Sequence, residues 1–204
     1  MGDENNTNLD REEYAIILDF LPNGYPFDNT PSYLKKPIAQ AIGTRNFVLL
    51  ELIPKKEAFL QPMQEVYIGM GKREEIHHVT GITAYEKLTA TAKAELVYVI
   101  QNLVKKKEQQ FIEFINKARS LTTRMHSLEL LPGLGKKRMW ELIEERENEP
   151  FKSFEDIKKR VKQMPDIVEM FTKRIIEEFS NDEQKHRLFV KIRREPSQSQ
   201  QRRH

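Results

Sequence analysis

The spacing of apolar residues changes near residue 89, and this change limits the folds that the chain can adopt. Before it, apolar residues form short runs of strand length, such as 14–21 and 47–53, and each run is followed directly by a proline. After it, apolar residues recur three and four positions apart, as they do on one face of an α-helix. The sequence therefore predicts an α+β protein in which a β-rich part precedes a helical part.

The β-rich part is predicted to be a small barrel. Two further runs, 65–69 and 76–83, have the length and the β-branched content of strands. Residues 37–43 are predicted to form a short helix, because a proline stands at the start and a glycine at the end. The segment 24–36 is a long proline-containing loop, and loops of this length in compact domains are often functional. Several short strands around one small helix favour an OB-like β-barrel.

The helical part contains an internal repeat. Residues 90–107 are predicted to form an amphipathic helix that continues in 111–118, and the pattern stays helical up to residue 179 with breaks at prolines. When the chain is shifted by 33 residues, 131–134 (Leu-Pro-Gly-Leu) lies over 164–167 (Met-Pro-Asp-Ile). Each copy is therefore predicted to be a helix, a tight turn and a second helix, and the two hairpins would share one core.

The turn at 131–137, Leu-Pro-Gly-Leu-Gly-Lys-Lys, is the most specific motif in the chain. Its two glycines permit a tight turn and leave no Cβ in the way of an approaching group. The free N–H groups at the start of the next helix would face that group, with the positive end of the helix dipole behind them. This motif resembles the turn of the helix-hairpin-helix family of nucleic-acid binders, which do not read base sequence. The resemblance predicts a phosphate site made of Gly133, Leu134, Gly135, Lys136, Lys137 and Arg138.

Charges at the two helix starts suggest that the two copies of the repeat have different roles. Lys136, Lys137 and Arg138 lie in a first turn, where the helix dipole makes each cation unfavourable by about 0.3–1 kcal/mol. The second copy has the acids Asp166 and Glu169 there instead. We therefore expect the first hairpin to bind phosphate and the second to be its packing partner. The alternative is that the two glycines only make a tight corner between helices.

Charge is also distributed unequally between the N-terminal and C-terminal parts of the chain. Residues 1–86 contain 8 Lys and Arg against 13 Asp and Glu, whereas 87–204 contain 26 against 18. A polyanion would be attracted to the basic half, although a solvated helical half with a basic tail gives the same composition. The predicted parts are a disordered N-terminal tail (1–11), an OB-like β-barrel (12–88), connecting helices (89–120), a tandem helix-hairpin-helix domain (121–183) and a basic C-terminal tail (184–204).

Other candidate features are less specific. Lys72 and Arg73 beside a glycine-rich turn are either a second phosphate contact or a plain exposed loop. Trp140 is expected in the hairpin core rather than on a stacking surface. Four aromatic residues of the N-terminal part are either core residues or base-stacking rings: Tyr14, Phe47, Tyr67 and Tyr85.

The residue types present speak against a metal or a cofactor. The chain has no cysteine, which excludes disulfides and thiolate metal sites. His77 and His78 are adjacent, and neighbouring residues of a strand are expected to point to opposite faces. The sequence contains no run of 18 apolar residues, and its acidic start is unlike a secretory signal, so a cytoplasmic protein without a membrane partner is predicted.

The order of motifs resembles that of an uncharacterised archaeal family, which joins an OB-like N-terminal domain to a tandem helix-hairpin-helix C-terminal domain. The matching stretches are 14–21, 31–33, 37–43, 49–54, 66–69 with Arg73, and 121–137. The resemblance implies a nucleotide-binding or RNA-binding protein connected with translation or ribosomal RNA.

The leading prediction is a non-enzymatic protein that holds the phosphate backbone of RNA or DNA. A second hypothesis is an adaptor whose acidic barrel docks a basic partner, such as a ribosomal protein. A third is a DNA glycosylase/lyase, since that class carries a similar turn with a lysine nucleophile and an aspartate. Lys137 and Asp156 are the candidates for those two residues, but the helical part is short for such an enzyme.

Overall fold

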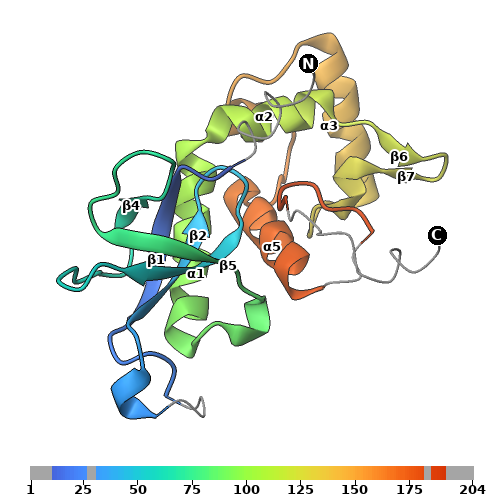
Figure 1. The fold of residues 1–204 in the computed structure, drawn as a ribbon. Helices are drawn as coiled ribbons and strands as arrows, with labels where there is room; N and C mark the ends of the chain where they lie inside the picture. Colours follow the sequence, from blue (N-terminus) through green and yellow to red (C-terminus); the bar gives the residue numbers. More distant parts are fainter. Residues whose placement is uncertain (1–10, 27–30, 182–184, 192–204) are drawn as a thin grey trace, which may run out of the picture. The chain divides into compact units, whose positions relative to one another are not determined.

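The structure is a computed structural model that describes residues 11–26, 31–181 and 185–191. These residues divide into two compact units, one containing those of 11–84 and 185–191 and the other containing 85–181. The first unit is built on a curled antiparallel sheet and the second is mainly helical, so the fold is of the mixed α+β kind (Figure 1). Most residues of the two predicted tails lie outside the described residues.

The sheet of the first unit has five strands in the order β4-β1-β2-β3-β5. Every neighbouring pair is antiparallel, and no pairing between β4 and β5 is recorded among the described residues, so the sheet is a half-barrel. A short 3-10 helix, Ser32–Leu34, lies between the first two strands. The strands are β1 (Tyr14–Leu21), β2 (Ile38–Gly43), β3 (Leu49–Pro54), β4 (Glu65–Tyr67) and β5 (Ile76–Ile82).

One face of this sheet carries the core of the unit. Alternate residues of the strands meet in one cluster, in which Ala39 and Ala41 of β2 are fully buried. The segment 185–191 also belongs to this unit: Phe189 and Val190 are buried, and the Lys191 N–H donates to the Asn46 carbonyl (3.2 Å).

The prediction of a helix at 37–43 is wrong. Ile38–Gly43 is strand β2, which pairs with β1 on one side and with β3 on the other. Five of its six residues are buried, and an unbroken buried run has no period that separates a helix from a strand. Pro37 stands just before the strand, where its missing N–H costs no ladder hydrogen bond.

The second unit contains five α-helices among its described residues. Phe171 of α5 lies at the centre of the unit, with its ring centroid 4.6 Å from that of Phe111 and 6.3 Å from that of Phe154. Helix α1, which begins at the N-cap Thr89, packs against α5 (Figure 1). The helices are α1 (Ala90–Lys106), α2 (Glu108–Lys117), α3 (Lys136–Asn148), α4 (Phe154–Arg160) and α5 (Ile167–Ser180).

The helix expected before the first turn is also absent. The chain instead forms a hairpin of two short strands, β6 (Ser120–Thr122) and β7 (Met125–His126), and then a 3-10 helix, Ser127–Leu130. The Thr122 side chain accepts a hydrogen bond from the Arg124 N–H (3.2 Å), which favours a turn over a helix here.

The two turns correspond at a different shift from the one that the sequence suggested. Gly133 (φ 83°) and Gln163 (φ 54°) hold equivalent left-handed positions, 30 residues apart. Each lies two residues after a buried residue, Leu131 or Val161, that follows the preceding helix. The helix starts are 31 residues apart, because the second turn holds one more residue before its helix begins, and this makes Asp166 of α5 the counterpart of Gly135 as the helix N-cap. The predicted shift of 33 holds for buried residues, since Leu128, Leu134 and Leu142 lie over the buried Val161, Ile167 and Ile175.

Candidate nucleic-acid interface

The first turn is fixed by two buried leucines and one glycine. Leu131 and Leu134 are 1% and 7% exposed, and the Leu134 N–H donates to the Leu131 carbonyl (3.1 Å). Gly133 has a φ of 83°, a conformation that side-chain-bearing residues rarely adopt. Leu134, predicted within the site, therefore anchors the turn through its buried side chain.

Gly135 is a glycine that the described fold does not need. As the N-cap of α3 it has φ −69° and ψ 154°, which any residue can adopt. A Cβ built on it would meet no atom within 4 Å. Its carbonyl accepts from the Met139 N–H (3.0 Å), but it has no side chain to cap the first N–H groups of the helix. The helix start is open to an approaching group.

The three cations after Gly135 differ in their environment. Lys136 and Lys137 are exposed and make no hydrogen bond or ion pair with any described residue. Arg138 is half-buried, and its guanidinium donates from Nε to the Gln163 carbonyl (2.6 Å) and from Nη2 to the Gln163 Oε1 (3.0 Å). Arg138 therefore ties the first turn to the second.

The second turn, which precedes α5, ends in a side-chain cap at the start of the helix. Asp166 is the N-cap of α5, and its Oδ1 accepts from the Glu169 N–H (2.8 Å). Glu169 in turn pairs with Lys173 (2.6 Å). Lys159 and Lys162, before and within this turn, are exposed and have no partner in the described part of the chain.

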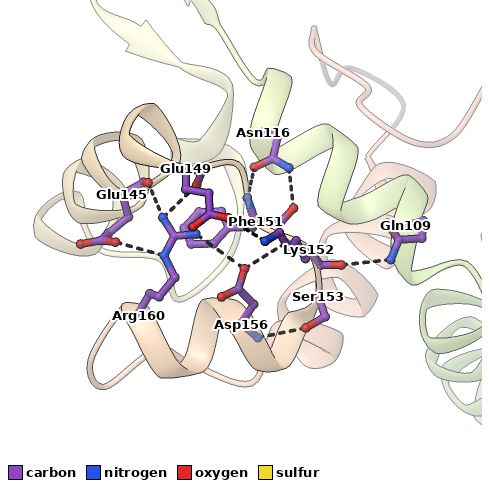
Figure 2. Close-up of polar contacts among 9 residues, drawn as sticks. All are labelled: Gln109, Asn116, Glu145, Glu149, Phe151, Lys152, Ser153, Asp156 and Arg160. Carbon is purple, nitrogen blue, oxygen red and sulfur yellow. Dashed lines mark hydrogen bonds and ion pairs between the residues drawn. The ribbon is translucent and has the colours of Figure 1, made fainter.

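A polar network joins the end of α3 to α4 and α2 (Figure 2). Arg160 of α4 donates to the carbonyls of Glu145 and Glu149 at the end of α3, and it pairs with the Glu145 carboxylate (3.1 Å). Its guanidinium also lies over the Phe151 ring, 4.4 Å from the centroid. Arg160 therefore caps the end of α3 and fixes the following helix against it.

Two further residues, Asn116 and Asp156, take part in the network. The Asn116 amide both accepts from the Phe151 N–H (2.9 Å) and donates to its carbonyl (2.8 Å). Asp156 accepts from the Lys152 N–H (3.0 Å) and lies 3.6 Å from Arg160, as Figure 2 shows. The aspartate considered for lyase chemistry thus has a structural position in this network.

A histidine caps the 3-10 helix that leads into the first turn. The His126 Nδ1 accepts from the Leu128 N–H (3.1 Å), and Glu129 accepts from the His126 N–H (2.8 Å). Burial lowers the pKa of His126, and the nearby Arg146 guanidinium lowers it further. Glu129 and a backbone hydrogen bond at Ala118 act in the opposite direction. The neutral imidazole is the form that caps.

Lys72 and Arg73 lie in the first unit, and the structure does not place them relative to the turn. Lys72 is exposed. The Arg73 Nε donates to the Gly69 carbonyl (2.9 Å), and the Gly71 N–H donates to the Tyr67 hydroxyl (3.0 Å). Arg73 thus stabilises the loop in which it lies.

The predicted functional loop 24–36 is anchored at its start, although 27–30 lie outside the described residues. The Tyr25 hydroxyl donates to Glu51 (2.8 Å) and accepts from the buried Gln40 (3.0 Å). Burial raises the pKa of Tyr25 to about 12, so the phenol stays protonated and able to donate at any ordinary pH.

The aromatic residues are placed differently from the prediction in one important case. Trp140 is 62% exposed, so the expectation that it lies in the hairpin core is wrong. Phe47 is fully buried. Tyr14 is 44% exposed and lies edge-to-face with Tyr67 (5.3 Å), and Tyr85 has the Lys93 ammonium 5.2 Å from its ring.

The two adjacent histidines also differ from expectation. The Nδ1 atoms of His77 and His78 are 2.8 Å apart, so the rings do not point to opposite faces. No group of three or more His, Asp or Glu side chains that would suit a metal ion occurs among the residues that the structure describes. Within the same residues, no helix has the length and apolar character needed to span a membrane.

The comparisons with known proteins agree on one family. Residues 11–191 match the family model described as "Protein of unknown function (DUF655)". The chain belongs to this family. It is 46% identical over 181 residues to the uncharacterized protein MJ0038 of Methanocaldococcus jannaschii, covering 88% of this chain and 80% of that protein.

A solved structure of the DUF655 family is similar along most of the chain. The crystal structure of Af1531 from Archaeoglobus fulgidus shares 46% identity and superposes with a TM-score of 0.82. The match covers 88% of this chain and all of the other. The expectation of an uncharacterised family with archaeal members is therefore confirmed.

Proposed function

We propose that this DUF655 protein binds nucleic acid without enzymatic activity, and that the start of α3 holds a backbone phosphate. The observation that carries the proposal is Gly135, a glycine that neither its own backbone angles nor the described packing requires. An absent Cβ is useful there if a phosphate must approach the amides. Lys136 and Lys137 supply cations that no described residue neutralises.

We further infer that the second unit is a tandem helix-hairpin-helix domain and that the first is OB-like. Two turns with equivalent left-handed residues, each followed by a helix, support the first inference. A curled five-stranded sheet supports the second.

The second turn extends the proposed surface. Arg138 and Gln163 join the two turns directly, and the second turn adds the exposed cation Lys162. No base-reading element accompanies these cations, so we expect recognition of backbone and shape rather than sequence.

A salt titration with matched variants tests the proposal. Affinity for single-stranded and duplex RNA and DNA of one length is measured between about 50 and 200 mM salt. Binding through phosphates requires log K to fall steeply with log salt. The variant Lys136→Glu/Lys137→Glu should reduce that slope by about 1.4–1.8, at roughly 0.7–0.9 per phosphate contact.

The control variant is Lys56→Glu/Lys105→Glu, which changes the net charge equally at exposed lysines outside the turn. It should keep most of the affinity. Equal losses from both variants would indicate attraction by net charge alone, and no binding by any nucleic acid would favour the adaptor hypothesis. RNA is the expected ligand because the family resemblance implies it, and the DNA arms test that choice.

A further inference from the structure

Trp140 is an exposed aromatic side chain on an otherwise anchored helix. Its neighbours on α3, Met139 and Leu142, are 2% and 0% exposed, whereas Trp140 is 62% exposed. It makes no ring contact or hydrogen bond with any residue that the structure describes. Tryptophan is usually largely buried, and proteins that bind single-stranded nucleic acid combine exposed aromatic rings with nearby cations. The fold therefore gains little from an indole at this position.

The position of Trp140 relates it to the proposed phosphate site. Lys136 and Lys137 precede it by four and three residues, so all three side chains share one face of α3. Four residues of helix span about 6 Å, and helical side chains lean toward the N-terminus, which brings the indole toward the start of α3. Glu144 is exposed one turn further along the same face and would repel a phosphate there. A polyanion beside Trp140 is thus favoured on its N-terminal side.

We propose that Trp140 stacks on an unpaired base next to the phosphate held at the start of α3. This inference rests on the proposed function. An indole can stack on a base only where the face of that base is free, as in single strands, loops and unstacked ends. In a continuous duplex the base faces are covered by their neighbours. The ligand class is therefore single-stranded or loop-containing nucleic acid, with no preference among base sequences.

The chain contains one tryptophan, so intrinsic fluorescence reports on this residue alone. Three probes are titrated into the full-length protein: a single-stranded RNA, a blunt duplex of the same length, and inorganic polyphosphate, which carries charge without bases. Stacking predicts quenching by the single strand, much less by the duplex and none by polyphosphate. A single-stranded DNA arm establishes whether the sugar matters.

Variants at Trp140 separate stacking from charge. Trp140→Ala should weaken binding of single-stranded RNA by roughly 5- to 150-fold, since stacking on one base is lost. Trp140→Phe keeps a ring and should recover part of that loss, whereas Trp140→Leu keeps only an apolar side chain and should not. Polyphosphate affinity should be unchanged in all three variants. Only a small change in thermal midpoint is expected, because the side chain is largely exposed and makes no ring contact or hydrogen bond with any described residue.

The outcomes distinguish this inference from the function on which it rests. If the Lys136→Glu/Lys137→Glu variant loses binding but Trp140→Ala binds every probe normally, stacking is wrong and phosphate binding stands. Equal losses of single-stranded and polyphosphate binding in Trp140→Ala would also overturn stacking. If Trp140→Ala instead abolishes self-association of the protein in sedimentation, Trp140 belongs to a protein interface. If no probe binds the unaltered protein, the proposed function fails first.

Discussion

Replacing Gly135 by aspartate should make the protein more stable and its nucleic-acid binding weaker. Gly135 already has extended N-cap angles, and a Cβ there meets no atom within 4 Å, so the new side chain fits. Asp166 shows the expected geometry, because from the same position of α5 it accepts the N–H of the residue three positions later. In the variant that donor is the Arg138 N–H.

The stabilisation can be estimated from two contributions. An aspartate cap in place of glycine adds a few tenths of a kcal/mol. A negative charge in the first turn adds about 0.3–1 kcal/mol, and Lys136 and Lys137 are close enough to favour it. The sum of about 0.6–1.3 kcal/mol corresponds to a thermal midpoint raised by roughly 1–5 °C for a chain of this size.

Binding should change in the opposite direction. The new carboxylate would accept the hydrogen bond from a backbone N–H that is proposed to bind the ligand. It would also add a negative charge where we place a phosphate. We expect the affinity for RNA to fall at least about tenfold, a loss of about 1.4 kcal/mol. Thermal unfolding followed by circular dichroism, and binding followed by fluorescence anisotropy, measure the two effects on one protein sample.

The reciprocal variant Asp166→Gly is the control. It removes the cap of α5 and should lower the free energy of unfolding by about 0.5–1 kcal/mol without weakening RNA binding. Two results would refute the reasoning. A lower thermal midpoint in Gly135→Asp would mean that the fold requires this glycine, and a raised midpoint with unchanged affinity would mean that no phosphate is held there.

Three further predictions concern residues that hold the site. Arg160→Met should lower the free energy of unfolding by about 1–3 kcal/mol in denaturant titrations, because it removes a helix cap and a partly buried ion pair. His126 has a lowered pKa in the fold, so its contribution to stability is complete above its ordinary pKa of about 6.5 and is lost as the pH falls through the lower folded value. His126→Asn keeps a capping side chain, and its thermal midpoint should not show this loss; an equal loss would implicate another group. Arg138→Ala should lower the free energy of unfolding by about 1 kcal/mol, because Gln163 loses its hydrogen bonds to the guanidinium. The slope of log K against log salt should stay unchanged. A slope reduced by one contact would show that Arg138 binds phosphate itself.

Local sequence patterns predicted β1 and α1 within one residue of their observed bounds. Strand β1 was expected from an apolar run of strand length that ends before Pro22, and α1 from apolar residues three and four positions apart. Strand β2 was missed because nearly all of its residues are buried, and its identity depends on pairing with two distant strands. Pairing partners far apart in the chain leave no local pattern.

The candidate site was predictable as a motif but not as a set of contacts. The glycines and lysines of the motif follow from the local sequence. Two features did not: Arg138 binds a residue of the other turn, and Trp140 is exposed. Each depends on how α3 is rotated against the rest of its unit, and the apolar pattern of a short helix leaves that rotation poorly defined.

The repeat provides a comparison within one chain. Both α3 and α5 start after a turn with a left-handed residue, so folding sets similar demands on the two starts. The start of α5 has an aspartate cap and an acid in its first turn, whereas α3 has neither and carries two lysines that pair with no described residue. Single substitutions would give α3 the more stable arrangement, since Gly135 has room for a side chain. Under the proposed function, a ligand whose negative charge replaces the missing acid offsets this local loss of stability.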